Sequence, residues 1–159
     1  MKRIILTTIA ALFAISAFAQ IQKEDLAIIQ SKFQKTKTDL VKANIQMSDE
    51  QGKVFWPLYE TYEAKRLDLS NQRAAIVNDY LTGYKTMTGQ EASALANRTF
   101  ANDKSFTSLQ KSYFKKFADA IGGVNAAKFY QLENYLQEIV RLQVQDNIPF
   151  IGELDKEKH

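Results

Sequence analysis

Residues that interrupt helices are scarce in this chain. Two prolines and six glycines occur among its 159 residues. A β-sandwich or barrel needs a turn about every ten residues, and proline and glycine supply most such turns. The chain is 45% hydrophobic and 25% charged, which is typical of a globular domain and not of a disordered segment. The sequence therefore predicts an all-α fold with long helices.

Two residue counts remove most enzyme chemistry. The chain has no cysteine, so it cannot form disulfides, thiolate metal sites, a cysteine nucleophile or an acylated lipoprotein cysteine. Its one histidine is the last residue, His159, which leaves no imidazole base inside the fold. Neither GxGxxG nor GxxxxGK[ST] occurs, and the carboxylates, lysines and tyrosines are dispersed. We therefore expect no catalytic residues, no metal and no cofactor.

The first nineteen residues have the pattern of an export signal. A basic start, Met1-Lys2-Arg3, precedes the apolar run Ile4–Ala14, and Ala17-Phe18-Ala19 matches the small-residue cleavage site. The alternative is an uncleaved membrane anchor, although the apolar run, counted to Ala19, has about sixteen residues and is short of the ~20 that span a bilayer. We expect a signal peptide over 1–19, cleavage before Gln20, and a periplasmic protein that is not embedded in the membrane.

The net charge gives no sign of nucleic-acid binding. The chain has 21 basic and 18 acidic residues, and cleavage before Gln20 would remove two basic ones, Lys2 and Arg3. The mature protein would then carry a net charge near +1, without the basic excess of a nucleic-acid-binding domain. A periplasmic location also excludes a mechanism driven by ATP.

Capping boxes mark two helix starts. In Ser48-Asp49-Glu50-Gln51 the Ser48 hydroxyl can accept from the Gln51 amide, and the Gln51 side chain can accept from the Ser48 amide. Thr88-Gly89-Gln90-Glu91 repeats this logic. With the apolar periodicity and the break at Gly122-Gly123, these signals predict four helices: Glu24 to Ala43, Ser48 to about Thr82 with a kink near Pro57, Thr88 to about Ile121, and Asn125, as the cap, to about Asp146.

The predicted helices are long relative to the chain. Two of them have near thirty-five residues, which is about 50 Å at 1.5 Å per residue. Such helices form an elongated hairpin arrangement, and the apolar residues in the middle of each helix need a further helix to pack against. We therefore expect a curved homodimer. The expected single domain covers residues 20–152, with Ile148 to Ile151 folded back onto helix ends, and a charged tail follows at 153–159.

The pentapeptide around the first capping box resembles a known motif. Met47-Ser48-Asp49-Glu50-Gln51 is similar to the L-T-x-x-Q motif of the Spy/CpxP family of periplasmic stress proteins, with Met47 for the leucine and Ser48 for the threonine. Phe55 follows seven residues after Ser48, and Phe129 lies seven residues after Gly122 in a degraded second copy, Ile121 to Asn125. The similarity of these two stretches suggests a weak internal duplication.

The resemblance implies both a shape and an activity. It implies an α-helical, cradle-shaped dimer acting as an ATP-independent chaperone that holds unfolded clients on a concave surface. Other members modulate envelope signalling kinases or bind metal. The metal-binding members use histidine-rich segments, which this chain lacks.

The third predicted helix has a second apolar face, opposite its core stripe. At 100° per residue the face combines lysines with apolar residues, namely Phe100, Lys104, Lys111, Phe114, Lys115, Ala118 and Ile121. It is covered by the fourth helix or a second protomer, or it binds a client. The polar middle of the second helix, with Lys65, Arg66 and Arg73, either lines the same cradle or is a solvated face.

Two functions therefore remain. One is an exported chaperone-like protein that binds unfolded or partly folded envelope proteins through this mixed apolar and basic surface. The other is a periplasmic adaptor that docks on the periplasmic domain of a membrane sensor in envelope-stress signalling.

Overall fold

The protein is all-α in the part of the chain that the structure describes. The computed structural model describes residues 23–146 and 148, and it contains no strand among them. The helices are α2 (Lys23–Asn44), α3 (Asp49–Gly83), α4 (Gly89–Ile121) and α5 (Gly123–Asp146). The four expected helices are confirmed to within a few residues at each end. The expected signal peptide and charged tail, and all of the fold-back segment except Ile148, lie outside the described residues.

Both capping boxes form as predicted. The Gln51 amide donates to the Ser48 hydroxyl at 3.3 Å, and the Ser48 amide donates to the Gln51 side chain at 2.9 Å. At the second box the Glu91 amide donates to the Thr88 hydroxyl at 3.3 Å, and the Thr88 amide donates to Glu91 at 2.8 Å. The backbone bond from Thr88, followed by its hydroxyl bond, lowers the pKa of Glu91. Local sequence thus fixes where α3 and α4 begin.

One glycine joins α4 to α5. The Gly122 amide donates to the Ala118 carbonyl at 3.0 Å, and the Gly122 carbonyl accepts from the Ala126 amide at 3.0 Å. Its φ of 82° is in the left-handed region that glycine adopts without a Cβ clash. The prediction that Asn125 caps the last helix is wrong, because α5 already begins at Gly123. The Asn125 side chain instead donates to the Ile121 carbonyl at 3.2 Å.

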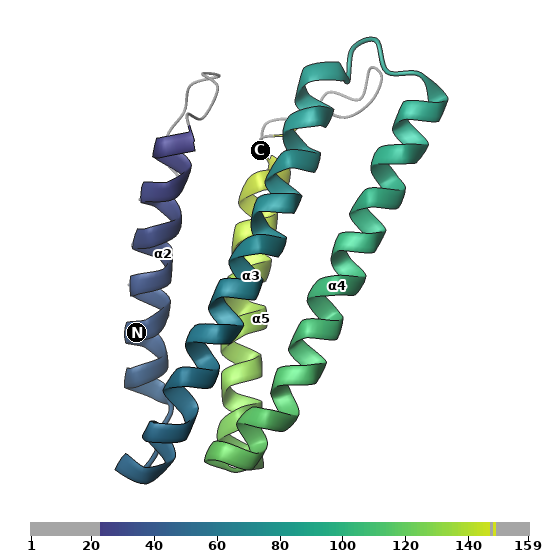
Figure 1. The fold of residues 1–159 in the computed structure, drawn as a ribbon. Coiled ribbons are helices and arrows are strands. Elements are labelled where there is room, and N and C mark those ends of the chain that lie inside the picture. Colours follow the sequence, from purple (N-terminus) through teal and green to yellow (C-terminus); the bar gives the residue numbers. More distant parts are fainter. Residues whose placement is uncertain (1–22, 147, 149–159) are drawn as a thin grey trace. The chain divides into compact units, whose positions relative to one another are not determined.

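The described residues fall into two compact units, one ending at Gln46 and the other beginning at Met47. The first contains α2 alone. In the second, α3 and α4 are joined at one end and α4 and α5 at the other, so that neighbours in sequence run antiparallel (Figure 1). Helix α3 continues through Pro57, and the Thr61 hydroxyl donates to the Pro57 carbonyl at 2.9 Å. The kink at Pro57 stays a prediction.

Aromatic rings form the core of the second unit near the α4–α5 junction. Phe117 of α4 lies at ring-centroid distances of 5.1 Å from Phe55 of α3 and 4.8 Å from Phe129 of α5. Phe55 and Phe129 themselves are 6.0 Å apart, with their planes at 79°. Edge-to-face rings at these separations are favourable beyond the burial of their area. The two phenylalanines that follow the resembling motifs therefore meet in one core.

Candidate functional site

The outer face of α4 presents aromatic residues among lysines. Phe100 is 66% exposed and Phe114 is 40% exposed, and the three lysines between and beside them are also exposed. Ala118 is half-buried at the end of this face. We call this set the α4 surface; it consists of Phe100, Lys104, Lys111, Phe114, Lys115 and Ala118. Six of the seven residues expected for this surface are thus exposed or half-buried.

The seventh residue, Ile121, does not belong to the surface. It is 2% exposed and lies in the core, because the helical rotation at the end of α4 turns it toward the α4–α5 junction. Helix α5 also covers part of the surface: the Phe114 and Tyr130 rings meet edge-to-face at 6.4 Å. Coverage by the last helix, which was one of the three alternatives for this face, therefore applies to Phe114 and not to Phe100.

The three basic residues of α3 are in three different environments. Lys65 is exposed, with its Nζ 5.6 Å from the centre of the Tyr113 ring. Arg73 is half-buried and pairs with Asp103 of α4. Arg66 is neither a solvated residue nor a cradle residue, since its side chain is only 12% exposed and its Nε donates to Glu63 Oε2 at 3.0 Å. The expectation that the polar middle of the second helix lines a cradle or is a solvated face is wrong for Arg66, because a buried carboxylate on its own helix pairs with it.

The interior of the second unit contains a charged cluster. Glu63 is 0% exposed and Glu133 is 4% exposed, and the Tyr62 phenol hydrogen-bonds to Glu133. Burial lowers the pKa of Arg66, but the carboxylates of Glu63 and then Glu133 outweigh it, so the net pKa is raised and the guanidinium stays charged. Two helices thus contribute opposite charges and a phenol to one buried cluster, and buried charges of this kind need each other.

A polar residue on an apolar stripe could have revealed this cluster from the sequence. Phe55, Tyr59 and Glu63 follow each other at intervals of four, and Phe129 and Glu133 do the same on α5. Each glutamate therefore occupies a position where the helical period calls for an apolar side chain. On α4, Asn102 likewise lies between Thr99 and Phe106 on the core stripe, and it is buried.

The Tyr62 phenol gives a testable alkaline effect. Burial, followed by the charge of Glu133 and the hydrogen bond to it, raises the pKa of Tyr62 well above its ordinary value of 10.0. Tyr62 therefore stabilises the folded state fully below pH 10. Above pH 10 this stabilisation declines, because the unfolded chain releases the phenol proton while the folded chain retains it. We expect the Tyr62 contribution to the free energy of unfolding to fall by about 1.4 kcal/mol per pH unit above pH 10.

Urea titrations between pH 9 and 11.5 measure this slope. The free-energy gap between wild type and Tyr62→Phe should narrow as the pH rises, because phenylalanine has no proton to release. The control Tyr135→Phe removes a phenol that is 41% exposed and should keep the wild-type slope. Parallel pH curves for wild type and Tyr62→Phe would contradict the prediction.

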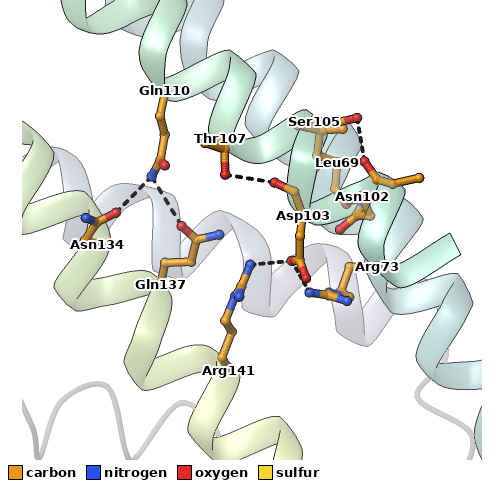
Figure 2. Close-up of polar contacts among 11 residues, drawn as sticks. Leu69, Arg73, Asn102, Asp103, Ser105, Thr107, Gln110, Asn134, Gln137 and Arg141 are labelled. Carbon is orange, nitrogen blue, oxygen red and sulfur yellow. Dashed lines mark hydrogen bonds and ion pairs between the residues drawn. The ribbon is translucent and has the colours of Figure 1, made fainter. Parts of the chain in front are cut away.

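A second polar layer connects the three helices nearer the middle of the unit. Figure 2 shows Asp103 of α4 between Arg73 of α3 and Arg141 of α5, with the Arg141 contact at 2.7 Å. Two turns further along α4, Gln110 donates to Asn134 at 3.1 Å and to Gln137 at 3.3 Å (Figure 2). These hydrogen bonds and ion pairs fix the register of α4 against both neighbours.

Asn102 also connects α3 and α4. Its Nδ2 donates to the Leu69 carbonyl at 3.0 Å, and its buried Oδ1 accepts no hydrogen bond from the described residues. Beside it an open groove of about 550 Å³ runs between α3 and α4. Its lining is mostly small or apolar and consists of Ala64, Lys65, Asp68, Leu69, Ser105 and Leu109. The groove does not converge on a set of catalytic groups.

Two further observations concern metal binding and membrane-spanning helices. Within residues 23–146 and 148 no three His, Cys, Asp or Glu side chains come together in a way that could hold a metal ion. None of the helices in that stretch combines the length and the apolar character needed to cross a membrane.

Sequence and fold were also compared with known proteins. No family model matches the chain, and neither the curated proteins nor the solved structures include a significant match.

Proposed function

We propose that the protein is an exported, ATP-independent, chaperone-like protein that binds unfolded envelope proteins through the α4 surface. The export part follows from the signal-peptide pattern at residues 1–19. The similarity of Met47–Gln51 to the Spy/CpxP motif supports the same function. The observation that carries the proposal is the mixture of exposed aromatic rings and lysines on the outer face of α4.

Exposed aromatic rings give the surface its affinity for apolar segments. Burial of apolar area is worth about 25 cal/mol per Å² and has no preferred direction, so many sequences can use it. Phe100 is accessible over most of its side chain, and Phe114 keeps an accessible edge beside Tyr130. The contact area is small and its shape is not matched to one partner. We infer weak binding that allows a client chain to rearrange while bound.

The lysines add attraction at longer range. Between Phe100 and Ala118 the chain has four lysines and one acid, Asp103, which two arginines already engage. The surface is therefore positive although the mature chain is nearly neutral. Such a field raises the rate of encounter with acidic unfolded chains and is screened by salt, with a Debye length of about 10 Å at 0.1 M.

An aggregation assay tests the proposal. The purified mature protein should suppress the aggregation of a chemically denatured model substrate at a ratio near one to one, and added salt should weaken this effect. The double variant Phe100→Ala, Phe114→Ala should lose most of the suppression. The matched control Val124→Ala removes an apolar side chain that is 74% exposed on α5, outside the α4 surface, and should keep it.

Two outcomes would contradict the chaperone function. The first is equal aggregation with and without the protein, and the second is full suppression by the double variant. If suppression is absent while deletion of the protein changes envelope-stress transcription, the result would favour an adaptor that docks on the periplasmic domain of a membrane sensor.

A further inference from the structure

Two arginines share one carboxylate oxygen where the three helices meet. The Nη2 atoms of Arg73 and Arg141 both contact Oδ1 of Asp103, the second at 2.7 Å. Figure 2 shows the two guanidiniums approaching Asp103 from different helices. The described residues supply no donor to the other oxygen, Oδ2. Since both guanidiniums are held by a single oxygen atom, their charged groups lie close together in space.

Most of the donors in this triad are free to bind something else. A guanidinium has five N–H donors in a planar fork that matches two oxygens of a carboxylate. Neither Arg73 nor Arg141 makes a further hydrogen bond within the part of the chain that the structure describes. The side chains of Arg73, Asp103 and Arg141 are 26%, 37% and 37% exposed, so a small ligand can reach them.

The charge balance of the triad favours one more monoanion. Two guanidiniums face one carboxylate, which leaves a net charge of +1. Adjacent turns contribute one exposed lysine, Lys104, and one exposed acid, Glu138, so they leave this excess in place. Burial lowers the pKa of Arg73, Asp103 opposes this, and the repulsion from Arg141 adds to the lowering. The lowered pKa of Arg73 is consistent with two neighbouring guanidiniums that share a single carboxylate.

We propose that Arg73 and Arg141 form a binding site for a carboxylate group supplied by a ligand. The ligand carboxylate accepts from the guanidinium N–H groups that Asp103 leaves unused, and it brings the charge of the triad to zero. A carboxylate fits better than a phosphate dianion, which would leave the site negative. The site borders the α4 surface, because Asp103 lies between Phe100 and Lys104 in sequence. It does not depend on the proposed function, since a small carboxylate needs no client chain.

Arginine side-chain NMR signals test the site directly. Sodium acetate is titrated into the full chain against sodium chloride at equal ionic strength, and the Nε–H signals are followed. We expect acetate to shift the signals of Arg73 and Arg141 to saturation, and chloride to have little effect. Arg98 is the internal control, because it pairs one to one with Asp79 at 2.7 Å and is about half exposed.

Two variants sharpen the test. Arg141→Gln keeps the Arg73–Asp103 pair but removes the second cation, so acetate should no longer shift the Arg73 signal. Arg98→Gln should leave the response unchanged. A circular dichroism spectrum shows whether each variant keeps its helices. The proposal fails if acetate and chloride act alike, if Arg98 responds as Arg73 does, or if the folded Arg141→Gln variant still responds.

A peptide experiment identifies the source of the carboxylate. An unstructured peptide that contains glutamates is compared with the same peptide containing glutamines. Shifts at Arg73 and Arg141 with the glutamate peptide, at lower concentration than with acetate, would assign the site to acidic side chains of a bound polypeptide. Saturation by acetate without a response to this peptide would assign it to small free carboxylates. Either result would stand even if the protein did not suppress aggregation, so the carboxylate site and the chaperone function are tested separately.

Discussion

Replacing Arg66 by methionine should cost about 3–5 kcal/mol of unfolding free energy, as expected when one partner of a buried ion pair is removed. Glu63, the partner of Arg66, is fully buried, and Glu133 lies in the same cluster. Methionine keeps most of the length and apolar stem of arginine but removes a cation that stabilises both carboxylates. Both carboxylates then lose a neighbouring positive charge in the interior, which destabilises the folded state.

Urea denaturation at pH 7 measures the loss. The control is Arg98→Met, which breaks an exposed pair with Asp79 and should cost about 1 kcal/mol or less. A double-mutant cycle with Glu63→Leu separates the ion pair from other effects. Because Glu63→Leu removes the buried charge that Arg66 compensates, the two losses should be non-additive by about 1–3 kcal/mol. Additive losses, or a single loss below that of Arg98→Met, would contradict this account.

The helix boundaries could be predicted because their causes are local. The hydroxyl of Ser48 and the amide of Gln51 are three residues apart, and the hydrogen bonds between them form as soon as the helix begins. Gly122 ends α4 for an equally local reason, its left-handed backbone. Asn125 shows where local reasoning fails: its side chain could cap a helix, but α5 already begins at Gly123, two residues earlier.

The buried partners could not be predicted because they come from distant parts of the chain. Asp103 meets Arg73 and Arg141, which lie 30 and 38 residues away in sequence. The helical period predicts which residues share a face, but not how far one helix slides along another. A slide of one turn would give Asp103 different neighbours. The same uncertainty concealed the pairing of Tyr62 with Glu133.

Replacing Phe117 by alanine should also cost about 3–5 kcal/mol, the range for truncating a buried phenylalanine. Phe117 is 1% exposed and its ring contacts rings from all three helices of the second unit. Its removal leaves a cavity that rigid neighbouring rings cannot fill by small shifts. Urea denaturation followed by circular dichroism at 222 nm gives the free energy, and a loss below about 1.5 kcal/mol would show that the cluster can collapse around the gap.

Phe100→Ala is the matched control, because it removes the same ring from the exposed face of the same helix. Phe100 makes no ring contact within the described residues, so its loss should change the unfolding free energy by about 0.5 kcal/mol or less. In the aggregation assay, by contrast, Phe100→Ala should weaken the suppression of aggregation although the variant keeps its stability. If Phe100→Ala destabilises the fold as Phe117→Ala does, another part of the protein covers Phe100 in solution. In that case the outer face of α4 is structural and does not bind clients.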